Sequence, residues 1–563
     1  MPTRQSQWDA LDNDVDLLVI GGGITGCGVA RDAAKRGLKV ALVEMYDFAF
    51  GTSSRSSKLV HGGLRYLEQY EFGLVFEAVS ERRILMDLAP HLVNPLGFLF
   101  PVYDGHRHKL WFINAGMWLY DGLSLFRSPK THKKLNTKEV AELVPHLNAE
   151  GLKGAPLYYD CSTDDARLTL ENAVDAAHQG AHVVSFCKAK SFIKDENGRI
   201  RGAMVKDMFS GDVKEVRAKV VINATGPWTD RTISMSQPLE SGPLLRPTKG
   251  VHIVVSAKKL SIPHAVVCMH PDDERVLFAL PWGDETYIGT TDTDFDGDPK
   301  DVEATRDDVE YLIEATNAYF PGTPICKDDV RATWAGLRPL VAPPPKEGGS
   351  VSESAVSREH QIIVGQDGLI SIAGGKLTTY RRMSAEAVDM AVRVLQVVGG
   401  EKRDLAPSKT DKDPLPGGIG WPDDDDHDKV RDQVVEASGG LLDEKTARFL
   451  ADTYGMRALV IAERCANDQT LAAPLVDGRP EIVAQVHWAV EEEFAATVSD
   501  VMTRRTQLFY RDVDQGLGCT DAVADCMQAL LGWSDDVKQE SADAYRKQVA
   551  ASRAWQHEED AAE

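Results

Sequence analysis

The sequence predicts an α/β fold combined with an α+β part and an all-α C-terminal region. Three observations lead to this prediction. Residues 15–44 alternate strand-like apolar runs with a helical stretch, residues 246–343 contain short strand-like runs separated by turns, and the chain beyond residue 428 has helical periodicity. A chain of 563 residues has room for roughly two to four domains.

The first unit carries a glycine pattern of known physical meaning. An apolar run over residues 15–20 is followed by Gly21, Gly23 and Gly26 at G-x-G-x-x-G spacing, then by a helical stretch and a second apolar run that ends in Glu44. The first glycine permits a tight turn, the second lets backbone amides approach a pyrophosphate, and the third lets the helix pack close to the strand. The pyrophosphate lies at the helix N-terminus and the carboxylate accepts hydrogen bonds from a ribose. The unit therefore predicts a bound dinucleotide.

The composition is that of a globular protein, with 43% apolar and 26% charged residues. A formal net charge of −23 disfavours nucleic acid as a partner, because its phosphates would be repelled. The eight cysteines form no C-x-x-C pair, which is typical of a reducing compartment and gives no sign of an iron–sulfur or zinc site. No apolar signal segment is visible and no run approaches the roughly 18 apolar residues of a spanning helix, so we expect a cytoplasmic protein.

Residues 51–67 are rich in small hydroxylic residues and glycines. This composition predicts a loop that packs against a cofactor. His61, Arg65 and Tyr66 are close together in the loop and are candidates for one site, although a polar turn with an ordinary exposed arginine would explain the same spacing. A helix is expected over residues 71–90.

Residues 97–126 combine a basic cluster with an aromatic-rich apolar stretch. The cluster spans residues 106–109, and Asp121 is the only charged residue between Leu110 and Phe126. Basic residues beside such a stretch are typical of a helix that lies in a membrane interface. The alternative is a buried helix, which the residues alone favour slightly.

Two later segments join an apolar strand to a turn of small residues. One leads from residues 220–223 into the turn 224–228, and the other leads from residues 369–373 into Gly374–Tyr380 and a long helix. Turns of this kind at the carboxyl end of a strand let the backbone approach a ligand. Between them, the runs within residues 246–343 predict an antiparallel sheet that contains His252 and Arg338. An acidic loop in this region lacks the spacing of a calcium loop, so no metal site is predicted.

The chain after residue 398 divides into three parts. Residues 399–428 are rich in glycine, proline and acidic residues and are interpreted as a linker. Residues 429–534 have apolar residues at helical spacing, which predicts an all-α domain. The highly charged residues 535–563 are expected to form a flexible tail.

With these motifs in place, the sequence resembles the FAD-dependent glycerol-3-phosphate dehydrogenases of aerobic respiration. The resemblance implies a glutathione-reductase-like, Rossmann-type FAD-binding domain assembled from residues 15–90, 157–245 and 345–398. It also implies an inserted antiparallel substrate-binding domain made of residues 91–156 and 246–344. The segments that carry it, in the family's order, are GGGITGCGVARDAAKRGLKV, TSSRSSKLVHGGLRYLEQYEFGLV, YYDCSTDDARL, INATGPW, KGVHIVV, IGTTDTDFDGDP, AGLRPL and AGGKLTTYRRM.

The resemblance further implies which residues of this chain contact each ligand. The phosphate of the substrate would be bound by Arg65, Arg338 and Lys376, while Tyr66 and His252 would line the substrate pocket. The residues that would contact FAD are Gly21, Gly22, Gly23, Thr25, Gly26, Glu44, Thr52, Ser53, Ser54, Ser57, Ala224, Thr225, Gly226, Gly374, Gly375, Lys376, Leu377 and Thr378.

The activity implied by the resemblance is oxidation of sn-glycerol 3-phosphate to dihydroxyacetone phosphate, with electrons passing from the flavin to the membrane quinone pool. Arginine and lysine suit a phosphate dianion, and histidine suits removal of the hydroxyl proton near neutral pH. His252 and His61 are both candidates for this base, with Arg338 beside them in the catalytic set. Structural hydrogen bonding near the flavin is the alternative role for both histidines.

Quinone reduction requires a route to the bilayer, so the resemblance favours peripheral attachment to the cytoplasmic membrane through residues 97–126. A homodimer is a family-based expectation. Glycerol-3-phosphate oxidase, which reduces oxygen to hydrogen peroxide, would share almost every motif, and the membrane-like segment argues modestly against it. A non-catalytic flavoprotein scaffold would make the cations and histidines incidental.

Overall fold

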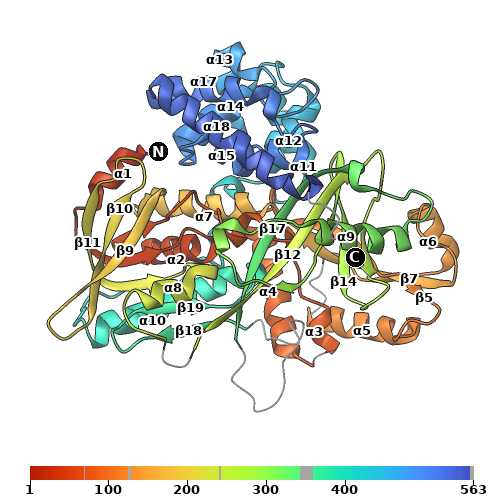
Figure 1. Ribbon diagram of the computed structural model, residues 1–563, viewed down its shortest axis with the longest axis horizontal. Helices are drawn as coiled ribbons and strands as arrows, with labels where there is room; N and C mark the ends of the chain where they lie inside the picture. The colour runs from red at the N-terminus through yellow and green to blue at the C-terminus, as the bar shows by residue number, and fades with distance from the viewer. Residues whose placement is uncertain (69, 125–128, 240–241, 343–358, 558–563) are drawn as a thin grey trace.

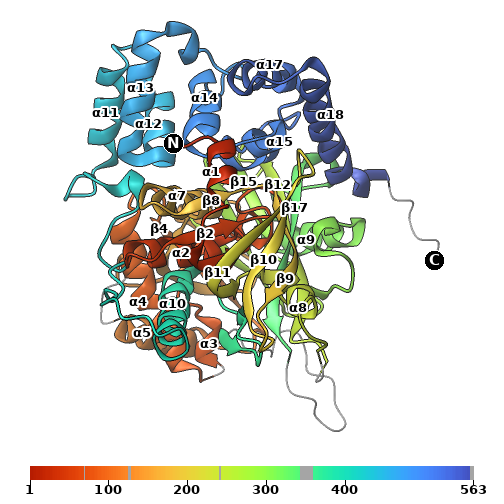
Figure 2. The same cartoon turned by 90° about the vertical axis from the view of Figure 1, so that its left-hand side faces the viewer.

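The structure is a computed structural model and describes residues 1–68, 70–124, 129–239, 242–342 and 359–557. Two β-sheet regions lie side by side, and the C-terminal helices cover one side of both (Figure 1). A view at right angles shows the helical region stacked on the sheets (Figure 2).

The first sheet has a parallel core that carries the glycine turn. Its main strand order is β18-β19-β11-β1-β2-β8. Strand β1 (Val15–Ile20) lies between β11 (Val213–Asn223) and β2 (Val40–Val43), parallel to both. The other strands of this region are β8 (His182–Val184), β9 (Cys187–Lys194), β10 (Ile200–Asp207), β18 (Gln361–Val364) and β19 (Ile370–Ala373).

Both faces of β1 are covered, which explains its uninterrupted apolar sequence. Leu17 and Val19 pack among helices on one face, whereas Leu18 and Ile20 pack with β10 and the N-terminal helix on the other. The helices around this sheet are α1 (Arg4–Ala10), α2 (Ile24–Lys35), α7 (Asp165–His178), α8 (Thr229–Ser234) and α10 (Tyr380–Val397).

The second sheet is antiparallel except for one pair of strands. Its main order is β16-β12-β15-β14-β13-β4-β7-β3, and β12 (Leu245–Ser256) also pairs along its length with β17 (Val330–Val341). The exception to the expected antiparallel sheet is β13 (Ala265–Met269), which is parallel to β4 (Asn94–Leu99). The remaining elements here are β5 (Val102–Tyr103), β6 (Lys133–Leu135), β14 (Val276–Trp282), β15 (Glu285–Gly289), β16 (Thr293–Asp294), α6 (Thr137–Leu143) and α9 (Arg306–Tyr319).

Two strands of the second sheet correct the predicted domain boundaries. Strand β7 (Leu152–Ser162) runs through the boundary predicted between residues 156 and 157, and β3 (Leu59–Val60) comes from the segment assigned to the FAD-binding part. Both belong to the second sheet because β7 pairs with β3, β4 and β6, which satisfies backbone groups that would otherwise lack partners. The boundary predicted at residues 344 and 345 lies outside the described residues.

The segment 97–126 is divided between strands and a helix, and its last two residues lie outside the described part. Helix α5 (Leu110–Leu123) packs beside α4 (Phe72–Leu88), the helix expected over residues 71–90. The sequence left a buried helix as the alternative to an interfacial one, and only one face of α5 is buried. Within the described part of the chain, no helix has the length and apolar content needed to cross a bilayer. The buried residues of α5 are Met117, Tyr120 and Asp121.

The C-terminal region is helical, but the segment before it is not a solvated linker throughout. Leu415 is fully buried, and its N–H donates to the carbonyl oxygen of Leu88 at 2.9 Å. Helix α11 (His427–Ala437) already begins within the predicted linker. The helices that follow are α12 (Glu444–Tyr454), α13 (Ala458–Asn467), α14 (Val483–Glu492), α15 (Val498–Asp500), α16 (Leu508–Arg511) and α17 (Thr520–Leu531), with a π-helical turn, η10, at Val501–Arg505.

The prediction of a flexible tail over residues 535–563 is wrong for most of that segment. Residues 535–552 form α18 (Asp535–Ser552), which packs against α17. The composition is highly charged, yet Ala542, Tyr545 and Val549 fall at helical spacing and form one buried stripe. Residues 558–563 lie outside the described part.

Candidate active site

A cavity of about 570 Å³ lies where the carboxyl ends of the first-sheet strands meet the second sheet. The turns after β1, β11 and β19 form one wall, and β12 and β17 contribute to the other. The predicted site residues that line it are Gly21, Gly23, Thr25, Glu44, Thr52, Ser53, Ser57, His61, Ala224, Thr225, Gly226, His252, Arg338, Gly374, Gly375, Lys376, Leu377 and Thr378.

The glycine turn leaves no room for side chains. A Cβ at Gly26 would lie 1.8 Å from the carbonyl oxygen of Gly21, and a Cβ at Gly21, where φ is +109°, would lie 2.6 Å from the carbonyl oxygen of Ala224. Gly23 is the N-cap of α2 and lines the cavity, so the positive end of this helix faces the cavity. Gly22 and Gly26 lie behind the lining and let the turn and helix pack closely. The cradle fits a pyrophosphate.

Glu44 directly follows the last residue of β2 and lines the cavity. Its Oε2 accepts a hydrogen bond from the N–H of Gly22 at 2.5 Å, and its Oε1 accepts one from the N–H of Tyr46 at 2.8 Å. Burial raises the pKa of Glu44 to about 6, although these two N–H groups oppose the rise. A carboxylate fixed at this place suits the ribose of a dinucleotide.

The hydroxylic loop after Gly51 connects the cradle to the second sheet. Ser53 Oγ accepts a hydrogen bond from the N–H of Ile24 at 2.9 Å, at the start of α2. Thr52 Oγ1 donates to the carbonyl oxygen of Leu337 on β17 at 2.6 Å. Ser54 is buried behind the lining. The loop therefore fixes the distance between the two walls.

His252 lies on β12 with 2% of its surface exposed. Its Nε2 is 2.9 Å from Ser57 Oγ, and its ring stacks on Trp334 with 4.7 Å between centroids. Nδ1 has no hydrogen-bond partner among the described residues. Burial, with the nearby charges of Arg338 and Lys58, holds the pKa of His252 well below its usual range. The imidazole is therefore neutral near pH 7.

Arg338 lies on the neighbouring strand, β17, and its guanidinium is fixed by the loop after β15. Its Nη1 donates to Asp292 Oδ1 at 2.9 Å, and its Nη2 donates to Thr290 Oγ1 at 3.1 Å and to the carbonyl oxygen of Thr291 at 3.0 Å. Because Asp292 lies on one side of the fork, the cation is oriented before any ligand arrives.

The remaining predicted residues come from the loop 61–68 and the turn after β19. Lys376 precedes α10, and its Nζ lies 3.6 Å from the ring centroid of Tyr66, which is buried beside the lining. His61 lines the cavity, and its backbone N–H donates to Thr378 Oγ1 at 3.2 Å. Arg65 begins the short helix α3 (Arg65–Glu68), and its side chain lies outside what the structure describes.

Several lining residues were not predicted. Arg55 lies in the TSSRSS segment, and its guanidinium packs over the Phe50 ring at 5.1 Å. Burial lowers the pKa of Arg55. Tyr46 and Cys187 line the part of the cavity next to Glu44, where the N–H of Cys187 donates to the Glu44 carbonyl oxygen at 2.7 Å. Arg55 is part of the TSSRSS motif, so the sequence offered a signal for it. No pattern in the sequence pointed to Cys187 at the start of β9.

A dinucleotide cradle opens here onto a space lined by a buried neutral histidine and fixed cations, under a second sheet. This combination is typical of an oxidoreductase that uses a dinucleotide cofactor.

Comparisons with known proteins define the family. A family described as FAD dependent oxidoreductase matches residues 16–381, and one described as the C-terminal domain of alpha-glycerophosphate oxidase matches residues 408–538. Aerobic glycerol-3-phosphate dehydrogenase of Staphylococcus saprophyticus is 38% identical over 551 residues, which are 97% of this chain and 95% of that protein. The enzyme of the same name from Staphylococcus aureus strain USA300 is 37% identical over 93% of this chain and 92% of that protein.

A solved structure gives the same result. The glycerol-3-phosphate dehydrogenase from Bacillus halodurans, complexed with FAD, matches with a TM-score of 0.80 and 31% identity over 99% of both chains. The chain belongs to the family of FAD-dependent aerobic glycerol-3-phosphate dehydrogenases, as the sequence predicted, and it is an FAD-dependent enzyme. L-alpha-glycerophosphate oxidase from Mycoplasma pneumoniae has a TM-score of 0.54 at 16% identity, over 72% of this chain and 99% of that chain, a likeness of fold alone.

Proposed function

We propose that this enzyme oxidises sn-glycerol 3-phosphate to dihydroxyacetone phosphate in the cavity described above and passes the electrons to a membrane quinone. The observation that carries the proposal is that His252 and Arg338 line the same cavity as the glycine cradle, from neighbouring strands. FAD, when bound in the cradle, supplies the acceptor for the two electrons and the hydrogen that leave carbon 2 of the substrate.

The substrate phosphate is held by cations. Arg338 offers a planar donor fork that Asp292 already orients, and Lys376 adds a point charge from the turn before α10. Arg65 is the third proposed cation, on the basis of its place in the GGLRY segment. Tyr66, packed on Lys376, fixes the position of that ammonium.

The proton of the substrate hydroxyl passes to His252. Support for this role is that the imidazole is buried, neutral near pH 7 and anchored by Ser57, so it accepts a proton without first losing one. His61 lines the same cavity and is the competing candidate. Arg338 near the reacting groups favours the developing negative charge on the substrate oxygen.

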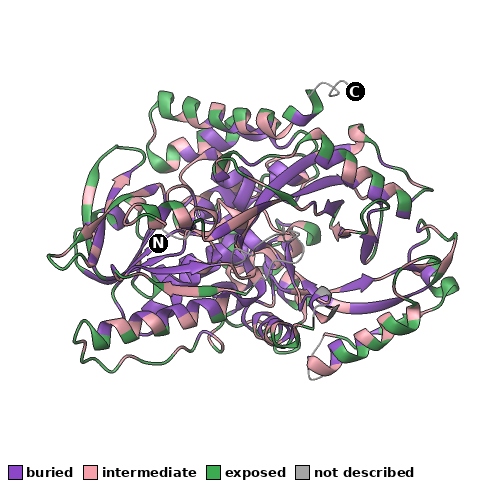
Figure 3. Cartoon of the chain, turned by 60° about the horizontal axis from the view of Figure 1, so that its bottom comes forward, coloured by how far each residue is buried: buried purple, intermediate pink, exposed green. Residues whose placement is uncertain are grey.

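The route to quinone is proposed along an exposed apolar surface, here called the aromatic face. Its α5 members include Trp111 and Trp118, with 67% and 56% of their surface exposed. Figure 3 views the underside of the molecule, where α5 lies, and exposed residues occur along the helices there. The aromatic face consists of Tyr70, Phe72, Phe76, Trp111, Phe112, Trp118 and Leu119.

The aromatic face is close in the chain to the cavity. Tyr70 and Phe72 follow Tyr66, whose ring packs on the cavity-lining Lys376. Exposed aromatic residues with basic residues 106–109 beside them suit the interface of an anionic bilayer. We therefore propose peripheral attachment at the cytoplasmic side of the membrane. A homodimer stays a prediction.

The test is anaerobic reduction of the purified yellow protein by sn-glycerol 3-phosphate, followed at the flavin absorption band. Bleaching, then rapid reoxidation by a soluble quinone and slow reoxidation by oxygen, is the expected result. Fast reoxidation by oxygen with peroxide formation would make the enzyme an oxidase. An amine that bleaches the flavin where glycerol 3-phosphate does not would overturn the proposed substrate.

A further inference from the structure

Lys58 is a buried cation that lies next to the cavity without lining it. It lies in the TSSRSSKLVHGG segment with 3% of its surface exposed and adopts a left-handed backbone conformation, with φ at +52°. Lysine is rarely buried unless it is paired, and positive φ is uncommon for any residue other than glycine. A buried lysine held at positive φ indicates that its position is constrained by the residues around it.

Three aromatic rings and one carboxylate surround the Lys58 ammonium. Its Nζ donates to Asp165 Oδ1 at 2.6 Å, and the ring centroids of Trp334, Trp282 and Tyr510 lie 5.5, 5.7 and 5.8 Å from it. Rings within about 6 Å stabilise a cation through their negative faces. The two tryptophans belong to the second sheet, whereas Tyr510 comes from α16 in the C-terminal region, so two parts of the fold complete the cage.

Asp165 also binds Ser56, which precedes Lys58 by two residues in the same loop. As the first residue of α7 it is fully buried, and the positive end of that helix favours its charge. Its Oδ2 accepts hydrogen bonds from the N–H and Oγ of Ser56, at 3.0 and 2.7 Å. The carbonyl oxygen of Ser56 accepts a third bond, from Trp334 Nε1, at 3.1 Å.

Ser57, between these two anchored residues, is thereby fixed against the cavity. Its carbonyl oxygen accepts a hydrogen bond from the Tyr287 hydroxyl at 3.1 Å, and its Oγ is the group bonded to His252 Nε2. The same Trp334 that contacts Lys58 stacks on the His252 imidazole. Lys58 and His252 are therefore joined by two routes, one through Ser57 and one through Trp334.

We infer that Lys58 is a positioning residue for His252: its caged ammonium holds Ser57 at Nε2 of the imidazole. This inference rests on the proposed function. The charges that act on His252 are Lys58 from the loop and Arg338 from β17, while β15 contributes the phenol of Tyr287 at 6.2 Å between centroids. Both charges are positive, and both lower the pKa of His252.

The inference is tested on the holoenzyme by measuring the rate of anaerobic flavin bleaching by sn-glycerol 3-phosphate as a function of pH. For Lys58→Met we expect a rate about 10- to 100-fold lower, because the base is misplaced. We also expect the acid limb of its pH–rate profile to move to higher pH, because a positive charge near His252 is gone. Lys58→Arg, which keeps the charge, should keep the limb of the wild type.

Lys58→Met alone leaves Asp165 as an unpaired buried charge, which threatens folding. The double variant Lys58→Met/Asp165→Asn removes both charges and should displace the limb in the same direction but less far, because loss of the Asp165 charge partly offsets loss of the ammonium. Lys219→Met is the matched control, because it removes an ammonium 2.8 Å from buried Asp16, outside the cavity lining, and should behave as wild type.

The possible outcomes separate the two proposals. The role of Lys58 would be overturned if the acid limb of the pH–rate profile coincided with that of the wild type in both Lys58→Met and the double variant. It would also be overturned if the limb moved equally far in Lys58→Arg. Loss of FAD from both neutral variants would overturn it too, because Lys58 would then serve the fold alone. Failure of the wild type to bleach would instead reject the proposed substrate.

Discussion

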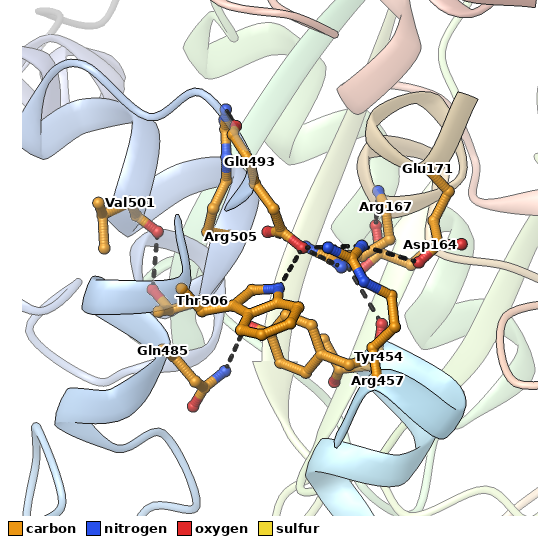
Figure 4. A network of polar contacts seen from close by, with 12 residues as sticks. Asp164, Arg167, Glu171, Tyr454, Arg457, Gln485, Glu493, Val501, Arg505 and Thr506 are labelled. Atoms are coloured by element: carbon orange, nitrogen blue, oxygen red, sulfur yellow. Dashed lines mark hydrogen bonds and ion pairs between the residues drawn. The ribbon is translucent and has the colours of Figure 1, made fainter. Parts of the chain in front are cut away.

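Arg167 and Glu493 form a bidentate ion pair that joins the C-terminal helices to α7. Nη1 and Nη2 of the arginine donate to the two carboxylate oxygens at 2.5 and 2.8 Å, and both side chains are fully buried (Figure 4). Glu493 also accepts a hydrogen bond from Trp488 Nε1 at 2.9 Å. Arg505 extends this contact, because it bonds both Asp47, just after β2, and the carbonyl oxygen of Glu493. The C-terminal region is thus fixed to the part of the fold that carries the glycine turn.

Glu493→Gln should destabilise the protein by about 3–5 kcal/mol, because Arg167 would remain as a buried charge without its full partner. The free energy of unfolding in urea, with FAD in excess, measures this loss. The control is Glu142→Gln, which breaks an exposed pair with Lys138 and should cost less than about 1 kcal/mol. Equal losses in the two variants would contradict the assigned role of the buried pair.

Glu171 should make the protein sensitive to acid. Burial alone would raise its pKa, but His91, Arg457 and Arg167 outweigh burial and lower the pKa to about 2. Since the unfolded carboxylate titrates near 4.5, its stabilising contribution of roughly 3 kcal/mol is complete above that pH and is lost as pH falls towards 2. Unfolding free energies of wild type and Glu171→Gln should therefore converge as the pH is lowered. A difference that stays constant with pH would show that Glu171 does not titrate in this way.

The sequence predicted the elements that depend on local patterns. Spacing located Gly21 and Glu44, and helical periodicity located α4. Long-range pairing was not accessible in this way: Arg167 and Glu493 are 326 residues apart in the chain. Strand β7 was divided between two predicted domains because alternation does not reveal which sheet a strand joins. The buried stripe of α18 was hidden by the charged residues around it.

Gly26→Ala should abolish FAD binding, because its Cβ would lie 1.8 Å from the carbonyl oxygen of Gly21 and force the turn away from α2. The purified variant is expected to be colourless, with the flavin-to-protein absorbance ratio as the measurement. Gly73→Ala is the matched control, since a Cβ there meets nothing within 4 Å and alanine favours the helix. A yellow Gly26→Ala protein would show that the cradle tolerates the methyl group.

The double variant Trp111→Ser/Trp118→Ser should weaken attachment to vesicles that contain anionic lipid by about 10-fold or more, because two large exposed side chains of the aromatic face are removed. Flavin bleaching by the substrate in solution should be unaffected, since neither residue lines the cavity. Phe209→Ser removes an aromatic residue with 54% exposure outside the aromatic face and serves as control. Unchanged sedimentation of the double variant with vesicles would place the contact elsewhere.

The rate of flavin bleaching in variants of His252 and His61 can show which of the two histidines accepts the substrate proton. His252→Asn should lower this rate by about 10²- to 10⁴-fold, because the proton acceptor is lost. His61→Asn should have a smaller effect, since its backbone bond to Thr378 persists in the variant. Burial, Arg338 and Lys58 hold the pKa of His252 below 6.5, so the wild-type rate should fall only well below that pH, where the imidazole gains its proton. A larger loss in His61→Asn, with His252→Asn close to wild type, would assign the base to His61 instead.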